Sequence, residues 1–269
     1  SRLRNAIRSA TPKIMSAVEP CCMVAPLMRQ PRFSDCGYIH PKYALKLWGE
    51  TLFTLVLRSF AHHNSEHRFI FVILADDERV ITSFIRETCI LCGIEWYSIC
   101  VLAEMTQGQA ETVTHALKEL TDIDLSESLY IFNIDTFYKP ALDLPVIESD
   151  GVLDCFKGHG DHWSFVSIGN DGRVITVAEK RRISDHCSTG LYGFGSAEIF
   201  LKGAALQKAN NALVAGEFYV APIFDLLIGL GYCFNARLLT GNEVFFSGTP
   251  LEYETLKKNK GAKRNYFAK

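Results

Sequence analysis

Residues 69–75 read FIFVILA, an unbroken apolar run of strand length. A strand with one face in water alternates apolar and polar side chains, whereas a parallel strand buried on both faces is apolar throughout. From Asp77 onward the apolar residues recur at helical spacing. This pattern stops at Gly93, and glycine commonly ends helices. A second strand-like run then covers residues 94–102. This strand–helix–strand order predicts a parallel βαβ unit.

The same alternation continues on both sides of this unit. Upstream, residues 20–27 form a short apolar run, expected as a buried first strand, and residues 51–60 have helical spacing. Downstream, residues 110–120 have helical spacing and residues 128–134 are again strand-like. Residues 28–42 combine prolines, a glycine and polar side chains, which is typical of a long loop. The first half therefore predicts a mostly parallel sheet with helices on both faces.

The second half of the chain changes character. Residues 163–168 and 173–178 flank the turn Asn170-Asp171-Gly172, which predicts a β-hairpin. The other elements expected there are a strand at 191–194, helices at 196–209 and 217–230, and strands at 232–239 and 243–246. The fold class is thus α/β, with a mixed, mostly parallel sheet and a β-hairpin insertion.

Composition indicates one globular domain spanning residues 1–269. The 269 residues are 48% apolar, and no linker, repeat or low-complexity tract divides them. Residues 1–20 are expected as an N-terminal extension. Residues 257–269 are expected as a basic tail, solvated or frayed like many termini.

Charge, hydropathy and cysteine usage exclude several classes of partner. A net charge of −2 shows no basic excess for nucleic acid, and no apolar run is long enough to span a membrane. Nine scattered cysteines, an odd number, are typical of a reduced, cytoplasmic protein. Apolar residues of the second half leave room for a homo-oligomer interface.

Asp135 follows the strand-like run at 128–134 directly. Ligands collect beyond the carboxyl ends of strands in open parallel sheets, and a carboxylate there suits a divalent cation held against phosphate oxygens. The alternative is a strand-end aspartate that caps the next turn. Asp135 is therefore a candidate Mg²⁺ ligand.

The segment Gln107-Gly108-Gln109 lies between a predicted strand and a predicted helix. Gly108 allows close approach of the backbone to a ligand, and the two glutamine amides suit the edge of a nucleobase. The alternative is an ordinary helix start. Lys42 and Lys180 each stand beside a structural break, and a lysine ammonium suits a phosphate. The alternative is that both are ordinary surface lysines.

Common signatures of other enzyme classes are absent from the sequence. It contains no GxSxG, no GxxxxGK[ST] and no GxGxxG. The simplest hydrolase, P-loop and dinucleotide-binding hypotheses are thereby excluded.

Six short segments follow one another along the chain: Arg32 to Tyr38 with Pro41-Lys42, Gln107 to Thr112, Asn133 to Thr136, Glu179-Lys180, Ser188 to Tyr192, and Gly248-Thr249-Pro250. Their order resembles that of the nucleotidyltransferase family that activates sugar phosphates, and most nearly that of its capsule and surface-polysaccharide branch. The resemblance implies a GT-A-like, Rossmann-related sheet. It also implies a Mg²⁺-assisted reaction, in which a sugar-1-phosphate oxygen attacks the α-phosphorus of a nucleoside triphosphate (NTP) and pyrophosphate leaves.

The resemblance also implies roles for individual residues. Lys42, Arg32 and Lys180 would act on phosphates, and Arg29, Gln107, Gly108 and Gln109 would bind the nucleotide. Glu179, Thr189 and Gly190 would contact the acceptor, and Asp135 would bind Mg²⁺. Many members carry a second metal carboxylate just ahead of the late Gly-Thr-Pro, where this chain has Phe246-Ser247, and either Glu217 or Asp225 would have to substitute for it.

One departure from the family pattern keeps other hypotheses open. The family's Gly-rich phosphate loop is replaced by residues 26–33, PLMRQPRF, and Pro31 has no amide hydrogen to donate. One alternative is a catalytically impaired member that binds nucleotide or sugar nucleotide as a regulatory or scaffold protein. The other is a related enzyme with a non-sugar phosphate acceptor.

Overall fold

The computed structural model describes residues 21–27, 31–60, 67–140 and 142–268. The expected N-terminal extension, residues 1–20, and Arg29 lie outside the described residues. Within the described chain the main sheet has nine strands, with the path β10-β9-β11-β6-β1-β4-β5; β8 also pairs with β11, and β12 pairs with β8. These strands are β1 (Cys21–Pro26), β4 (Arg68–Leu74), β5 (Tyr97–Leu102), β6 (Ser128–Ile131), β8 (Gly151–Lys157), β9 (Ser164–Ile168), β10 (Val174–Glu179), β11 (His186–Phe194) and β12 (Phe234–Leu238).

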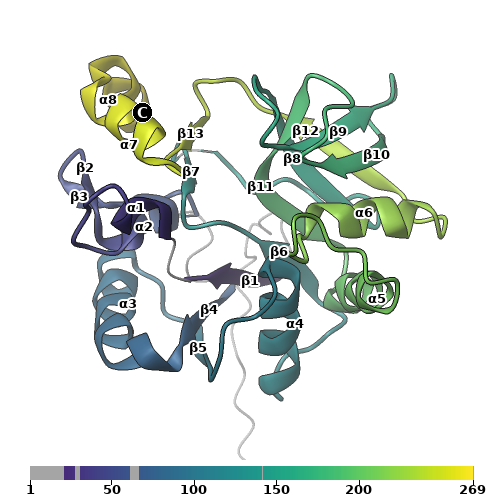
Figure 1. Ribbon diagram of the computed structural model, residues 1–269, viewed down its shortest axis with the longest axis horizontal. Helices are drawn as coiled ribbons and strands as arrows, with labels where there is room; N and C mark the ends of the chain where they lie inside the picture. The colour runs from purple at the N-terminus through teal and green to yellow at the C-terminus, as the bar shows by residue number, and fades with distance from the viewer. Residues whose placement is uncertain (1–20, 28–30, 61–66, 141, 269) are drawn as a thin grey trace, which may run out of the picture.

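Helices cover both faces of this sheet (Figure 1). On β1, Met23 belongs to the core formed with α2 and α3, whereas its neighbour Val24 belongs to the core formed with α4, α5 and α6. Successive side chains of a strand point to opposite faces, so an all-apolar strand supplies both cores. The helices are α2 (Leu52–Arg58), α3 (Glu78–Cys92), α4 (Gln109–Glu119), α5 (Ala197–Ala209) and α6 (Ala221–Ile228). None of the described helices is long and apolar enough to cross a membrane.

The central strands are parallel and the later ones mostly antiparallel. β1 pairs with β4 and β6 in parallel, and β4 pairs in parallel with β5. β11 then pairs antiparallel with both β6 and β8, and β9 with β10 forms the expected hairpin. The predictions of a mostly parallel sheet, of helices on both faces and of the hairpin are confirmed.

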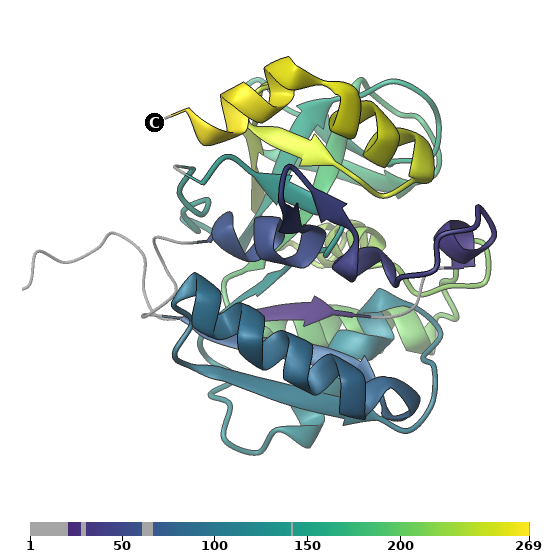
Figure 2. The ribbon, with the colours of Figure 1, turned by 90° about the vertical axis from the view of Figure 1, so that its left-hand side faces the viewer.

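The C-terminal segment is a packed helix rather than a frayed tail. α7 (Pro250–Lys258) and α8 (Lys260–Phe267) lie together over β13 (Val244–Phe246), which pairs with β7 (Thr136–Tyr138) (Figure 2). Tyr266 is 1% exposed, and its ring lies 5.5 to 5.7 Å from the rings of Trp48, Phe137 and Phe245. Most side chains of residues 257–268 are exposed, as expected for a solvated terminus, but the segment is helical and is anchored by Tyr266 rather than frayed.

Other boundaries also differ from expectation. β6 ends at Ile131, so Asp135 follows it after a short connection rather than directly. The expected loop at 28–42 contains the short helix α1 (Pro31–Ser34) and leads into a 3-10 helix at Lys42–Ala44. β8 was not predicted, because Asp154 interrupts its apolar pattern. The small β2 (Lys46–Leu47) and β3 (Glu50–Thr51) pair with each other.

Candidate functional site

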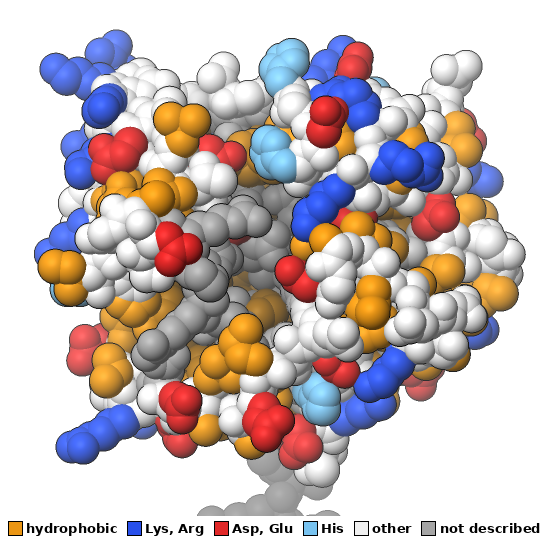
Figure 3. All heavy atoms as spheres, viewed as in Figure 1, with side chains coloured by type: hydrophobic (Ala, Val, Ile, Leu, Met, Phe, Trp, Pro, Cys, Tyr) orange, Lys and Arg blue, Asp and Glu red, His pale blue; other side chains and the backbone are white. Residues whose placement is uncertain are grey.

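The predicted phosphate lysine and the predicted metal carboxylate form an ion pair. Lys42 Nζ donates to Asp135 Oδ2 at 2.8 Å, although 93 residues separate them in the chain. The Lys42 side chain is 2% exposed and that of Asp135 is 20% exposed, so this ion pair is shielded but reachable from one side. The molecule is hollowed between the elements of its first and second halves (Figure 3).

Contacts from three parts of the chain hold this pair in place. The Asp135 carbonyl accepts hydrogen bonds from the Ser247 amide and hydroxyl, at 2.8 and 2.9 Å. The Lys42 ammonium stands 5.4 Å from the centre of the Phe33 ring, a cation–π distance. Phe33 in turn packs against Tyr253 of α7. Helix α7 therefore supports the segment that carries Lys42.

The predicted nucleobase segment is joined to the same region. Gln109 Nε2 donates to Asn133 Oδ1 at 2.7 Å, two residues before Asp135. Gly108 has φ +129°, and a Cβ there would lie 2.6 Å from the Phe218 carbonyl oxygen, so only glycine fits. The Phe218 amide donates to the Gln107 carbonyl at 2.7 Å. Glu217, the residue before Phe218, is thus held beside the Gln107-Gly108 turn.

Gly190 on β11 lies against the Asn133 side chain. Its φ is +92°, and a Cβ there would lie 2.4 Å from Asn133 Nδ2. Gln109, Asn133 and Gly190 therefore connect the predicted nucleotide and acceptor segments through one amide side chain.

A Gly190→Ala variant tests this connection. We expect kcat/KM to fall about 10- to 100-fold, because the displaced Asn133 no longer orients Gln109, with roughly 1–3 kcal/mol lost from the left-handed backbone. Gly172→Ala is the matched control, since φ there is +81° but nothing lies within 4 Å of the added Cβ. Steady-state kinetics and urea unfolding of both variants provide the comparison. Equal activity in the two variants would contradict the role given to the Gly190–Asn133 contact.

Glu179 and Lys180 stand at the end of the hairpin. The Glu179 carboxylate accepts a hydrogen bond from the Ser164 hydroxyl. Burial raises the pKa of Glu179, and the nearby negative charge of Glu217 raises it further, while Ser164 and Lys180 oppose the shift. Lys180 itself is exposed and contacts Tyr219, with Nζ 4.5 Å from the ring centre. A part-buried carboxylate and an exposed ammonium group thus follow one another at the end of the hairpin, and Glu217 belongs to their surroundings.

The other predicted residues differ in how they are placed. Thr189 is 2% exposed and its hydroxyl hydrogen-bonds that of Tyr138 at 2.7 Å, so its side chain is part of the supporting core. Arg32 belongs to α1. The sequence indicated Asn133 only as part of a motif, and it did not indicate Ser164 or Tyr219 as site residues. An amide two residues before a candidate metal carboxylate was the available signal for Asn133.

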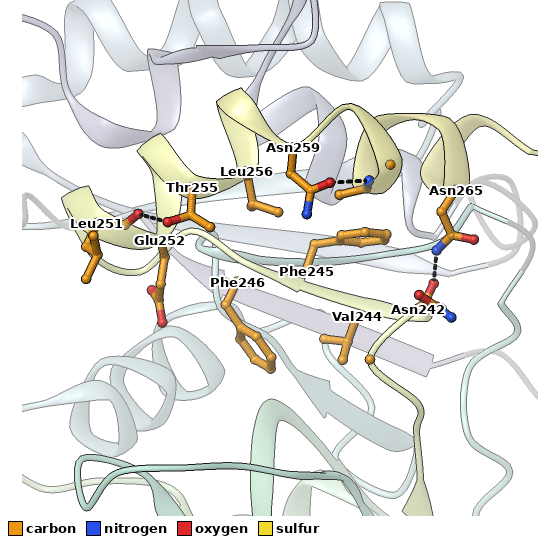
Figure 4. Close-up of a pocket in the computed structure, with 13 residues that line it drawn as sticks. Asn242, Val244, Phe245, Phe246, Leu251, Glu252, Thr255, Leu256, Asn259 and Asn265 are labelled. Atoms are coloured by element: carbon orange, nitrogen blue, oxygen red, sulfur yellow. Dashed lines mark hydrogen bonds between the residues drawn. The ribbon is translucent and has the colours of Figure 1, made fainter.

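A cavity of about 720 Å³ lies between β13 and helices α7 and α8 (Figure 4). Its lining includes Phe246 and Glu252, whereas the predicted site residues are not part of it. In Figure 4, Phe245 points toward the helices and Phe246 away from them. The cavity therefore borders the site but does not contain the Lys42–Asp135 pair.

The donor set around Asp135 suits a magnesium ion that arrives with phosphates. No group of three or more Asp, Glu, His or Cys side chains among the described residues forms a metal cage. A Cβ at Gly248 would lie 3.4 Å from Asp135 Oδ2 and 3.3 Å from Glu252 Oε2, so these carboxylates flank the same glycine. Mg²⁺ is commonly held by one or two carboxylates together with substrate phosphates. Asp135 fits that mode of binding.

Comparisons with known proteins identify the fold and the family. A scan against protein-family models finds no match, and a search of curated proteins also finds none. Among solved structures, the nucleoside-diphosphate-sugar pyrophosphorylase from Vibrio cholerae RC9 is 37% identical, with a TM-score of 0.81 over 88% of this chain and 100% of that chain.

Two more distant structures share the fold alone. The inositol-1-phosphate CTP transferase from T. maritima is 14% identical, with a TM-score of 0.68 over 93% of this chain and 96% of that chain. A putative glucose-1-phosphate thymidylyltransferase from Bacillus anthracis is 11% identical, with a TM-score of 0.68 over 88% and 94%.

The fold is that of a nucleotidyltransferase. The chain belongs to the nucleoside-diphosphate-sugar pyrophosphorylase family, as its identity to the Vibrio cholerae protein over that protein's full length shows. It is an enzyme of the nucleotidyltransferase type.

Proposed function

We propose that this enzyme transfers a nucleotidyl group from an NTP to a sugar-1-phosphate and releases pyrophosphate. The observation that carries the proposal is the shielded Lys42–Asp135 pair, which adjoins the Gln109–Asn133 contact beyond the carboxyl end of β6. A cation and a metal-binding carboxylate at the edge of a parallel sheet suit the phosphates of a nucleotide. Membership of the pyrophosphorylase family supplies the reaction class.

The chain's own residues have distinct tasks in this reaction. Gln107 and Gln109 hydrogen-bond the nucleobase, with Gly108 allowing its close approach. Lys42, with Arg29 and Arg32 of the preceding segment, neutralises the triphosphate. A phosphate oxygen of the acceptor attacks the α-phosphorus, the bond to the β-phosphate oxygen breaks, and pyrophosphate leaves. Catalysis is therefore mainly positioning and charge stabilisation.

The acceptor and the metal complete the proposed site. Lys180 binds the acceptor phosphate, and Glu179 accepts hydrogen bonds from the hydroxyls of the acceptor. Gly190 and the backbone of Thr189 line the acceptor pocket, while the Thr189 side chain supports them from the core. Asp135 would hold Mg²⁺ together with the triphosphate, and the ion would neutralise charge on the phosphate oxygens. Glu217 stays a predicted second carboxylate for that ion.

Pyrophosphate release tests the proposal directly. The protein is incubated with each NTP, Mg²⁺ and a panel of sugar-1-phosphates, and pyrophosphate and the sugar nucleotide are measured. We expect both products from at least one pair. Nucleotide binding by thermal shift without either product from any pair would favour the alternative, a binding protein that has lost turnover, which the missing glycines of residues 26–33 suggest.

The raised pKa of Glu179 predicts a pH dependence. Only the ionised carboxylate accepts hydrogen bonds at both oxygens, so kcat/KM for the acceptor should fall as pH drops through the pKa of Glu179. Because burial raises that pKa from 4.5, the fall should begin at a higher pH than for an exposed glutamate. Glu179→Gln should lower the plateau and remove this acid limb. An acid limb of the same position in Glu179→Gln would show that another group titrates.

Three finer proposals follow from the sequence and the family. The sugar nucleotide serves precursor synthesis for a capsule or surface polysaccharide, the protein works in the cytoplasm, and its partners are small substrates rather than nucleic acid or membrane. Eight cysteine side chains are described and none of these is in a disulfide, which supports a reducing compartment. A homo-oligomer stays a prediction, for which light scattering during gel filtration is the measurement.

A further inference from the structure

Three aromatic side chains meet between the hairpin and the C-terminal segment. The ring centres of Phe156 and Phe246 lie 4.5 Å apart, and each lies 5.0 Å from the ring of Trp163. Phe156 is 8% exposed, whereas Trp163 and Phe246 are half-buried. The His162 ring also packs on the Trp163 indole, with ring centres 4.5 Å apart and an interplanar angle of 37°, so Trp163 and Phe246 keep only part of their surface available to a ligand.

This aromatic trio is connected to the proposed acceptor residues by hydrogen bonds. The Trp163 carbonyl accepts the Lys180 amide at 2.9 Å, and the next residue, Ser164, donates its hydroxyl to the Glu179 carboxylate. The indole Nε1 of Trp163 donates to the His159 carbonyl at 2.9 Å, which fixes the orientation of the ring. A shift of the Trp163 ring would therefore displace Glu179 and Lys180.

The same trio is also connected to Asp135. Phe246 precedes Ser247, whose amide and hydroxyl both donate to the Asp135 carbonyl. Phe246 itself pairs, across the β7–β13 ladder, with Thr136, which is the residue that follows Asp135. The trio thus spans the interval between the proposed metal carboxylate and the proposed acceptor residues.

We infer that Trp163, backed by Phe156 and Phe246, forms an aromatic wall that stacks on the flat face of the acceptor's sugar ring. One face of a pyranose carries mainly C–H groups, and ligand sites combine such aromatic surfaces with a few polar groups that fix orientation. Glu179 and Lys180 are those polar groups here. The wall selects a cyclic acceptor over an open-chain phosphate. This inference rests on the proposed function.

Kinetics with separate variation of each substrate test the wall. In Trp163→Ala the KM for the preferred sugar-1-phosphate should rise about tenfold, while the KM for the NTP stays within about twofold. Trp163→Phe should recover most of the loss, because it restores an aromatic face. Trp96→Phe is the control, since Trp96 is 48% exposed and packs on Arg68, away from the trio.

Tryptophan fluorescence gives a readout that does not depend on turnover. Adding the sugar-1-phosphate to the protein with a non-hydrolysable NTP analogue should change the emission of the wild type and of Trp96→Phe. The same addition should leave the emission of Trp163→Phe unchanged, because the stacked indole is missing.

The outcomes separate this inference from the proposed function. Pyrophosphate release by the wild type with an unchanged acceptor KM in Trp163→Ala would overturn the wall and leave the function standing. Preferred transfer to phosphocholine or to another open-chain phosphate would also overturn it, since no sugar ring is then bound. Absence of pyrophosphate with every acceptor would overturn the proposed function itself and the inference with it.

Discussion

Asp135→Asn lowers kcat/KM for nucleotidyl transfer about 100- to 1000-fold, the range expected when a group that stabilises developing charge is removed. The substitution keeps the size and the polarity of the side chain but removes its charge. It therefore takes away both the counterion of Lys42 and the carboxylate that would hold Mg²⁺ against the triphosphate. The loss should appear mainly in kcat, because the charge is needed most during transfer.

Three measurements make this result interpretable. The Mg²⁺ concentration for half-maximal rate should rise in Asp135→Asn, and nucleotide binding measured by thermal shift should persist. Asp171→Asn is the control, since this aspartate is 65% exposed on the hairpin turn and should leave the rate unchanged. A wild-type rate in a folded Asp135→Asn protein would rule out the metal role of Asp135.

Asp154→Ala destabilises the folded protein by about 3–5 kcal/mol, as expected when one partner of a buried ion pair is removed. Asp154 is 0% exposed and receives two hydrogen bonds from Arg237, at 2.8 Å from Nε and 2.6 Å from Nη2. Arg237 also donates to the Asp143 carbonyl at 2.6 Å. Truncating Asp154 leaves the half-buried guanidinium of Arg237 without its carboxylate partner. This unpaired charge accounts for the large loss of stability.

Paired variants distinguish this pair from ordinary surface pairs. In Asp154→Leu combined with Arg237→Met, much of the lost stability should return, because both charges are gone. Asp171→Ala breaks an exposed pair with Arg173, at 3.6 Å, and should cost less than about 1 kcal/mol. Urea unfolding followed by circular dichroism gives all three free energies. Equal losses in Asp154→Ala and Asp171→Ala would contradict the importance of burial.

Local patterns in the sequence were enough to predict the centre of the fold. The unbroken apolar run in β4 predicted a strand buried on both faces. The helical spacing after this run predicted a crossover helix that leads to a parallel neighbour, which is β5. Such patterns are periodic over a few residues, so a short window contains them. The same reasoning located Asp135 and the Gln107–Gln109 segment near strand ends, where ligands collect.

Long-range contacts decided the rest. The pairing of Lys42 with Asp135, and the meeting of Gln109, Asn133 and Gly190, join segments far apart in the chain, and no local period records them. The sequence predicted a solvated or frayed tail where α8 lies, because the anchoring of α8 depends on one residue, Tyr266, whose ring contacts Trp48, Phe137 of β7 and Phe245 of β13. Most central elements were therefore readable from the amino-acid order, whereas β8 and the end of β6 were not. The partners of each site side chain were not, because packing of the whole chain selects them.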